Sequence, residues 1–289
     1  MSLERRPSLL SYKKNIPYLI IAPGLILLIV FLVLPLFTII YPTFYQGTLT
    51  LDAYVSFLSE SYNRGILWRT IRISLLVTFW TILLGLPTAA FIARTDRKWR
   101  SLLMGLVLFP LLTNSVVRSF AWINILGTNG IVNRLLLQTG IIDEPLRMLY
   151  SEFAITLGSL YLFLPLMITT LVGILENIDQ EILEAAETLG ASPFVAFMKV
   201  LLPLSLPGVI VGSVLVFTGT LTAYTTPQLL GGNQNMMMST FLYQNAMTLG
   251  DWESAGVIAV IMILTTVVVM NTFNWLAARI DRRGGELDA

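Results

Sequence analysis

Six long stretches without a charged residue constrain this chain more than any other feature of its sequence. Each is about as long as the roughly 20 residues that cross a bilayer core, or longer. Because hydrocarbon offers no partner to unpaired backbone groups, such stretches cross membranes as helices. We therefore predict an all-α integral membrane protein. End residues excluded, the charge-free intervals are Lys14–Asp52, Arg72–Arg94, Arg100–Arg118, Glu152–Glu176, Lys199–Asp251 and Glu253–Arg279.

These intervals predict six transmembrane helices. The chain begins with basic residues, as signal peptides do, but the apolar run from about Tyr18 to Tyr41 is too long for one. We interpret this run as an uncleaved first span. The transmembrane domain then covers 17–278, between tails at 1–16 and 279–289. The expected spans are about 17–41, 71–92, 102–126, 153–175, 204–225 and 255–278.

The placement of Lys and Arg predicts the orientation, because these residues gather on the cytoplasmic side of membrane proteins. With the N-terminus inside, twelve of the eighteen basic residues fall in the two tails or in the cytoplasmic connectors. We therefore predict that both termini are cytoplasmic. The connector 179–203, between the fourth and fifth spans, is predicted to lie on the same side.

The residue types that are absent exclude several kinds of active site. The chain has no Cys and no His, which excludes disulfides, thiol nucleophiles, and Ser-His or Cys-His catalysis. It has no G-x-x-x-x-G-K-[ST] phosphate loop, and its net charge of +1 gives no general attraction to nucleic acid. The run Met236-Met237-Met238 can bind a soft metal, but it is also ordinary apolar filling. We predict neither a metal site nor catalytic residues.

The connector 179–203 is longer and more acidic than a turn between two spans requires. Asp179 is suited to cap a helix, and Gly190 is suited to end it. Ser192 and Pro193 can begin a second helix, and Pro203 is expected where the chain returns to the bilayer. At 100° per residue the first helix has an apolar and an acidic face. The apolar face holds Ile182, Leu183, Ala186 and Leu189. The acidic face holds Glu181, Glu184 and Glu187.

The acidic face favours a protein partner over a lipid surface. Helices that lie on a membrane usually carry Lys and Arg on their polar face, because these residues meet anionic lipid. A carboxylate-rich face is repelled by such lipid. A protein with a basic cleft fits it better.

The same connector resembles the EAA motif of ABC-importer permeases. Glu184-Ala185-Ala186 is followed four residues later by Gly190, and after nine more residues by Val200-Leu201-Leu202-Pro203. The match departs from the family only at Val200, where isoleucine is commoner. The resemblance implies a type I ABC importer permease with six transmembrane helices, whose cytoplasmic coupling helices insert into a separate ATPase. The coupling residues it implies are Glu181, Glu184, Ala185, Ala186, Glu187, Gly190, Leu202 and Pro203.

Other stretches resemble one branch of that family, the spermidine/putrescine-type permeases. They lie at 114–118, 127–133, 140–143 and 226–232. The resemblance implies polyamine cargo, ATPase subunits that bind Mg-ATP, a second permease subunit in a heterodimer, and an external solute-binding protein. It also implies the plasma membrane of a bacterium, which is the inner membrane in a Gram-negative cell. Relatives that import opine, phosphonate, iron or other cationic solutes are alike here, so the cargo stays open.

Arg118 is the one basic residue deep in a predicted span. A charge at the bilayer centre costs about 2.5–3.5 kcal/mol on insertion scales, so Arg118 is expected to face protein or water. Its role is either structural, bonding backbone carbonyls or a carboxylate such as Glu152, or it belongs to a gate. The candidates for a translocation path or gate are Asn114, Arg118, Trp122, Tyr161, Tyr224 and Thr226. Asp251, Trp252 and Glu253 are the candidates for contact with cargo or binding protein.

Three functional classes compete. An importer permease works by alternating access, driven by ATP hydrolysis on its partner. A secondary transporter needs ionisable groups near mid-membrane, and only Arg118 comes close. A membrane scaffold without transport activity is the third class. The sequence favours the first.

Overall fold

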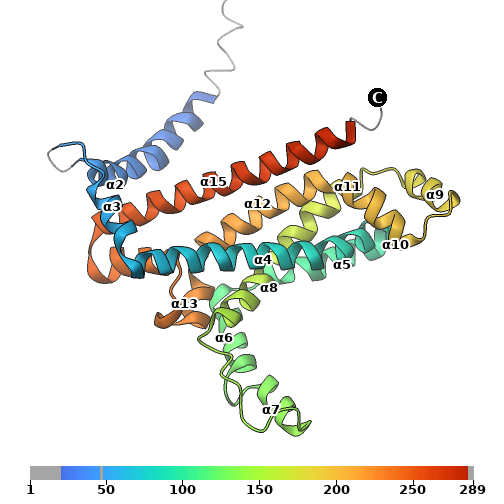
Figure 1. The fold of residues 1–289 in the computed structure, drawn as a ribbon, viewed down its shortest axis with the longest axis horizontal. Coiled ribbons are helices and arrows are strands. Elements are labelled where there is room, and N and C mark those ends of the chain that lie inside the picture. Colours follow the sequence, from blue (N-terminus) through green and yellow to red (C-terminus); the bar gives the residue numbers. More distant parts are fainter. Residues whose placement is uncertain (1–20, 46–47, 286–289) are drawn as a thin grey trace, which may run out of the picture.

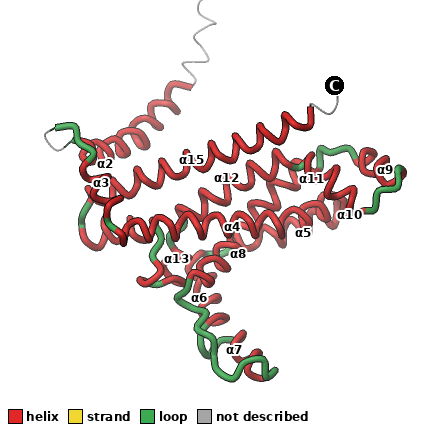
Figure 2. The backbone as a smooth tube through the Cα atoms, in the orientation of Figure 1, coloured by secondary structure: helices red, strands yellow, loops and turns green. Residues whose placement is uncertain are grey.

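A computed structural model describes residues 21–45 and 48–285. Helices make up nearly all of this part of the chain (Figure 2), and its only β contact is an isolated bridge between Tyr45 and Leu49. The long helices lie beside one another in a bundle, with α9 at one end and α3 near the other (Figure 1). We call these the α9 end and the α3 end. The all-α prediction is confirmed.

Five unbroken helices in the described residues are long and apolar enough to cross a membrane, and a bent pair brings the total to six. The unbroken helices cover Ile21–Phe44, Ser61–Arg94, Glu152–Leu175, Pro193–Thr222 and Trp252–Leu276. The successive elements are η1 (Ile29–Val33), α2 (Leu34–Phe44), α3 (Asp52–Ser59), α4 (Ser61–Arg94), α5 (Arg97–Leu112), α6 (Ser115–Leu126), α7 (Ile131–Gln138), α8 (Glu152–Leu175), α9 (Gln180–Thr188), α10 (Pro193–Ala196), η2 (Phe197–Leu201), α11 (Leu202–Leu204), α12 (Leu206–Thr222), α13 (Thr225–Gly231), η3 (Asn233–Asn235), α14 (Met238–Tyr243), η4 (Gln244–Leu249) and α15 (Trp252–Gly285).

The prediction of one continuous third span at 102–126 is wrong. α5 ends at Leu112, and the chain then turns by 92° into α6 and α7. The Asn114 side-chain oxygen accepts hydrogen bonds from the backbone N–H groups of Val116 (2.9 Å) and Val117 (3.3 Å). Asparagine is a favoured N-cap, so it starts a new helix in a new direction. The charge-free pattern does not register this break, because the residues around it are uncharged.

The fifth span begins earlier than the sequence predicts, at Pro193 rather than at 204. The second helix of the connector is therefore the first part of this long helix, and the chain does not change direction at Pro203. Pro203 lies inside the helix, directly after the π-turn η2, where the ordinary hydrogen-bond pattern is already interrupted. Proline lacks an N–H, so a π-turn is a place where a helix can accommodate it.

The other spans differ from prediction mainly at their ends. α8 coincides with the expected fourth span, whereas α4 begins ten residues before 71. α15 continues past 278 to Gly285, so the first part of the predicted C-terminal tail is helical. The tail 1–16, the start of the first span and residues 286–289 lie outside the described residues. Hydropathy marks the apolar part of a helix and not the polar turns that extend it.

The centre of the bundle is where α4, α8 and α12 pack closely. Met167 of α8 is fully buried there. A Cβ atom added at Gly85 of α4 would lie 2.9 Å from Met167 Cγ, and one at Gly212 of α12 would lie 2.5 Å from its Sδ. Small residues allow helices to approach this closely in membranes. Glycine at these two positions therefore sets the spacing of the three helices.

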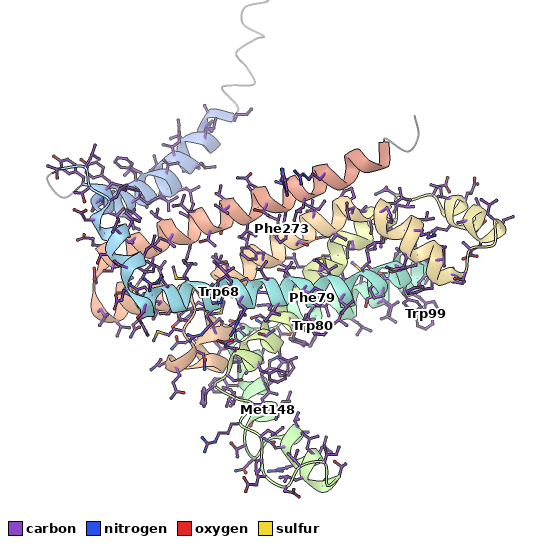
Figure 3. All side chains as sticks on the ribbon, viewed as in Figure 1. Trp68, Phe79, Trp80, Trp99, Met148 and Phe273 are labelled. Atoms are coloured by element: carbon purple, nitrogen blue, oxygen red, sulfur yellow. The ribbon has the colours of Figure 1, made fainter. Side chains whose placement is uncertain are left out.

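Much of the outer surface of the bundle is apolar. Trp68, Phe79 and Trp80 of α4 and Trp99 of α5 are all exposed and follow the two helices toward the α9 end (Figure 3). The helix Ile21–Phe44 meets α15 near the α3 end and leans away from the bundle (Figure 1). Thr43 is its only buried residue. These surfaces suit lipid or other membrane helices.

Candidate functional sites

α9 projects from one end of the bundle as a short helix that is capped at both ends (Figure 1). The Asp179 carboxylate accepts a hydrogen bond from the Glu181 N–H at 3.1 Å. Gly190 has φ +89°, and the N–H groups of Gly190 and Ala191 donate to the carbonyls of Glu187 (2.9 Å) and Ala186 (3.0 Å). This is the Schellman pattern, which requires a left-handed residue such as glycine. The predicted start and end of this helix are confirmed.

Only part of the predicted apolar face of α9 packs against the bundle. Leu183 is buried and Ala186 is partly buried, both against the core of the bundle. Ile182 and Leu189, predicted on the same apolar face, are exposed, and Leu189 is 88% exposed. Helical periodicity says which residues share a face, whereas a short helix at the end of a bundle has neighbours on only part of it.

The exposed side of α9 and the following turn is both acidic and apolar. Phe194, five residues after Leu189 in the chain, is 72% exposed. Clustered exposed apolar side chains mark sites of protein interaction. Of the other residues predicted for coupling, Leu202 is half-buried and Pro203 is exposed on the helix that follows. Those exposed on α9 are Glu181, Glu184, Ala185 and Glu187.

A second candidate site lies at the break between α5 and α6. Arg118 is only 7% exposed, and its Nη1 donates to the carbonyls of Pro110 (2.8 Å) and Thr113 (3.3 Å). These carbonyls belong to the end of α5, where helical partners are missing. The carbonyl contacts expected of a structural Arg118 are thus present. Its contact with Glu152 is not, because Glu152 pairs with Arg69 at 3.1 Å and with Arg72.

The remaining path candidates lie around α6, α8 and α13. Trp122 of α6 and Tyr161 of α8 meet edge to face, with ring centroids 5.7 Å apart. Thr226 of α13 is buried, and its methyl group would lie 2.9 Å from a Cβ atom added at Gly158. Asn114 caps α6. The structure therefore brings Arg118, Trp122, Tyr161 and Thr226 to neighbouring helices near the break.

Tyr224 has a partner that the sequence did not reveal. Its ring centroid lies 4.5 Å from that of Tyr243 in α14. The two residues are 19 positions apart, and no local pattern connects them. An aromatic pair that is partly exposed at the end of a span can attract a cation.

The candidates for external contact lie at the start of α15. The Asp251 carboxylate accepts a hydrogen bond from the Ser254 N–H at 2.9 Å, so Asp251 caps this helix. Hydrogen bonds from the side chain and backbone of Ser254 lower the pKa of Asp251. Trp252 is exposed. Glu253 and Glu60 line one cavity of about 210 Å³ between α3, α4 and α15.

The methionine run is part of the core. Met236, Met237 and Met238 are all buried, and Met237 packs into a different apolar cluster from the other two. The Met238 N–H donates to Thr70 Oγ1 at 2.9 Å, which ties the run to α4. These contacts are those of apolar filling.

Comparison with known proteins identifies the family of this chain. Residues 81–284 match the family described as "Binding-protein-dependent transport system inner membrane component". The chain belongs to this family. The permease prediction and the multi-pass membrane location are thereby confirmed.

Individual relatives agree with the family. The spermidine/putrescine transport system permease protein PotB of Escherichia coli (strain K12) is 30% identical over 246 residues, which cover 85% of this chain and 89% of the relative. PotB of Haemophilus influenzae is 34% identical over 229 residues, covering 78% and 80%. A crystal structure of a bacterial ABC transporter that imports the acidic polysaccharide alginate has a similar fold, with a TM-score of 0.79 over 93% of this chain and 98% of that chain. At 17% identity this likeness concerns the fold alone, and it confirms the predicted importer permease fold.

Proposed function

We propose that this permease imports polyamines, and that the α9 end couples it to a separate ATPase. The cargo rests on the likeness to spermidine/putrescine permeases at 30–34% identity over most of the chain. The coupling rests on one observation: α9 projects from the bundle, capped at both ends, and exposes Leu189 and Phe194 beside three glutamates. The EAA spacing falls on this same segment.

The α9 end is assigned to the cytoplasm. The basic residues of the α4–α5 connector and Lys199 gather at this end, as the positive-inside rule requires. The partner ATPase would bind Mg-ATP, since this chain carries no phosphate-loop sequence. The chain itself is a transport subunit and not an enzyme.

A continuous helix begins at Pro193, just after the turn that follows α9, and leads to the interior of the bundle. The fifth span runs without a break in its path from Pro193 to Thr222. A displacement of the α9–α10 segment is therefore passed into the centre of the membrane, where α12 packs on α8 and α4. ATP drives alternating access only if the ATPase favours one permease state over the other. The exposed α9 surface is where that preference would be applied.

The other partners are assigned from the remaining surfaces. The α3 end, with Asp251, Trp252 and Glu253, would face the external binding protein. The helix Ile21–Phe44 leaves most of its apolar surface uncovered, so a second permease subunit, in a heterodimer, would cover part of it. Arg118, Trp122 and Tyr161, with Asn114, Tyr224 and Thr226, would border the path, where aromatic faces can attract a polyammonium chain.

Reconstitution of the complete transporter in proteoliposomes tests this proposal. We expect ATP-dependent uptake of spermidine, and a loss of at least about tenfold in Glu184→Lys, because a cation replaces a carboxylate at the contact with a basic cleft. Glu144→Lys is the matched control, since Glu144 is an exposed acid far from α9 in the sequence. Equal uptake by the Glu184→Lys and wild-type proteins would refute the coupling role. Uptake driven by an ion gradient without the ATPase would favour a secondary transporter, and ATP-driven uptake of a different solute would refute the cargo.

A further inference from the structure

α5 packs on the bundle through partly buried side chains, among them Leu103, Met104 and Val107. It has 16 residues, and none of them is buried in the chain. Its two ends, in contrast, are held by arginines. Arg118 bonds the carbonyls at its C-terminal end, and Arg100 lies in its first turn. These two polar attachments hold the ends of α5, and the apolar packing holds its middle.

Arg100 connects three helix ends at once. Its Nη2 donates to the carbonyls of Ala93 (2.6 Å) and Thr95 (3.2 Å), at the end of α4. Its Nη1 donates to Glu176 Oε1 at 3.1 Å, and Glu176 directly follows the last residue of α8. The side chain is 30% exposed, and its Nε is buried. Trp99, the neighbour of Arg100, lies at the α9 end of the bundle (Figure 3).

Glu176 lies at the C-terminal end of α8, where its negative charge lowers the stability of that helix. A carboxylate at a helix C-terminus meets the negative end of the dipole. The ion pair with Arg100 offsets this cost and connects the end of α8 to α5. Glu176 is also only three residues before Asp179, which caps α9.

The connection from Glu176 to α9 is short and hydrogen-bonded. The N–H of Asn177 donates to the Ile174 carbonyl at 3.0 Å, and its side chain donates to the Gly173 carbonyl at 2.7 Å. Ile178 packs against the main core. Such a linker moves together with the end of α8 rather than absorbing motion.

We propose that Arg100 is a positioning residue that makes α5 follow the coupling segment. Movement of α9 reaches Glu176 through the short linker and reaches α5 through the Arg100 guanidinium. At the other end of α5, Arg118 transmits this movement to the break at 113–114 and to α6. This inference rests on the proposed function of α9.

Arginine is suited to this position because its planar fork binds several acceptors in fixed directions. Lysine carries the same charge but acts as a point charge on a flexible chain. We therefore expect Arg100→Lys to keep part of the coupling and Arg100→Gln to lose most of it. Arg97→Gln is the matched control, because Arg97 lies in the same turn, is exposed, and has no ion pair among the described residues.

The experiment compares spermidine imported with ATP hydrolysed in the complete reconstituted transporter. In Arg100→Gln we expect ATP hydrolysis to continue while spermidine imported per ATP falls about tenfold, within the range of about 2- to 30-fold that coupling mutations produce. Arg97→Gln should match the wild type. A purely structural role would lower assembly and hydrolysis together and leave the ratio unchanged.

Three results would overturn the inference. The first is an assembled Arg100→Gln transporter with the wild-type ratio, and the second is an equal fall in Arg97→Gln. If Arg100→Gln does not assemble, Glu176→Gln repeats the comparison, because it leaves the bonds from Arg100 to the carbonyls of Ala93 and Thr95 intact. The third result is an unchanged ratio of spermidine imported to ATP hydrolysed in Glu176→Gln. A wild-type transporter without ATP-driven uptake would instead refute the proposed function itself, and this inference with it.

Discussion

Replacement of Arg118 by alanine tests whether the broken span depends on one buried side chain. Arg118→Ala leaves the carbonyls of Pro110 and Thr113 without their donor. A hydrogen bond from a charged group contributes about 1.5–3 kcal/mol. The second bond, at 3.3 Å, is longer than the normal range and contributes less. We expect a loss of about 2–4 kcal/mol in the free energy of unfolding.

Thermal unfolding of the purified protein in detergent measures this loss. For a chain of this size 1 kcal/mol shifts the Tm by about 2–4 °C, so a loss of about 2–4 kcal/mol should lower the Tm of Arg118→Ala by about 4–16 °C. Membrane proteins often unfold irreversibly, so all variants are compared at one scan rate. The Tm of Arg118→Lys should lie between those of the wild type and Arg118→Ala, because lysine keeps the charge and loses the planar guanidinium.

The control for Arg118 is Arg134→Ala. Arg134 is exposed on α7 and should leave the Tm unchanged. An Arg118→Ala protein that unfolds at the wild-type temperature would refute the capping argument. If that protein were also unable to import solute, Arg118 would act in the gate rather than in the support of α5.

Three further predictions follow from single contacts. Gly190→Ala should lower uptake more than Gly190→Asn in transport assays, because the left-handed φ of +89° costs alanine about 1–2 kcal/mol and asparagine tolerates it. Gly212→Leu should unfold at lower temperature and Gly105→Leu should not, because a Cβ atom at Gly212 lies 2.5 Å from Met167 Sδ and one at Gly105 meets nothing within 4 Å. Hydrogen bonds from Ser254 lower the pKa of Asp251 in the folded protein, so its capping stability is present above the ordinary pKa of an aspartate and is lost as the pH falls through the folded pKa. Asp251→Asn keeps a cap without a charge, so its Tm should fall less than that of the wild type between pH 7 and pH 3.

Local chemistry predicted the parts of the fold that depend on one or two residues. Asp179 and Gly190 define α9 because a helix needs a side-chain acceptor at its start and a left-handed residue at its end. The charge-free intervals located the spans because charge is costly in hydrocarbon. The third predicted span is the exception, since Asn114 redirects the chain without adding a charge.

Contacts between distant elements were beyond the reach of the sequence. Ile182 and Leu189 share a face with Leu183, but only the bundle determines which of them it covers. The sequence suggested Glu152 as a partner for Arg118. Because α4 packs on α8, Glu152 instead forms ion pairs with Arg69 and Arg72. These outcomes depend on how helices are placed and not on the helices themselves.

Site-specific cross-linking tests the central claim most directly, namely that the exposed α9 surface binds the ATPase. The chain has no cysteine, so a single Leu189→Cys substitution gives one defined reactive site. In the assembled transporter we predict a cross-link from this site to the ATPase subunit, and none from Leu249→Cys, which is exposed near the α3 end. No cross-link from α9, or an equal one from position 249, would contradict the account.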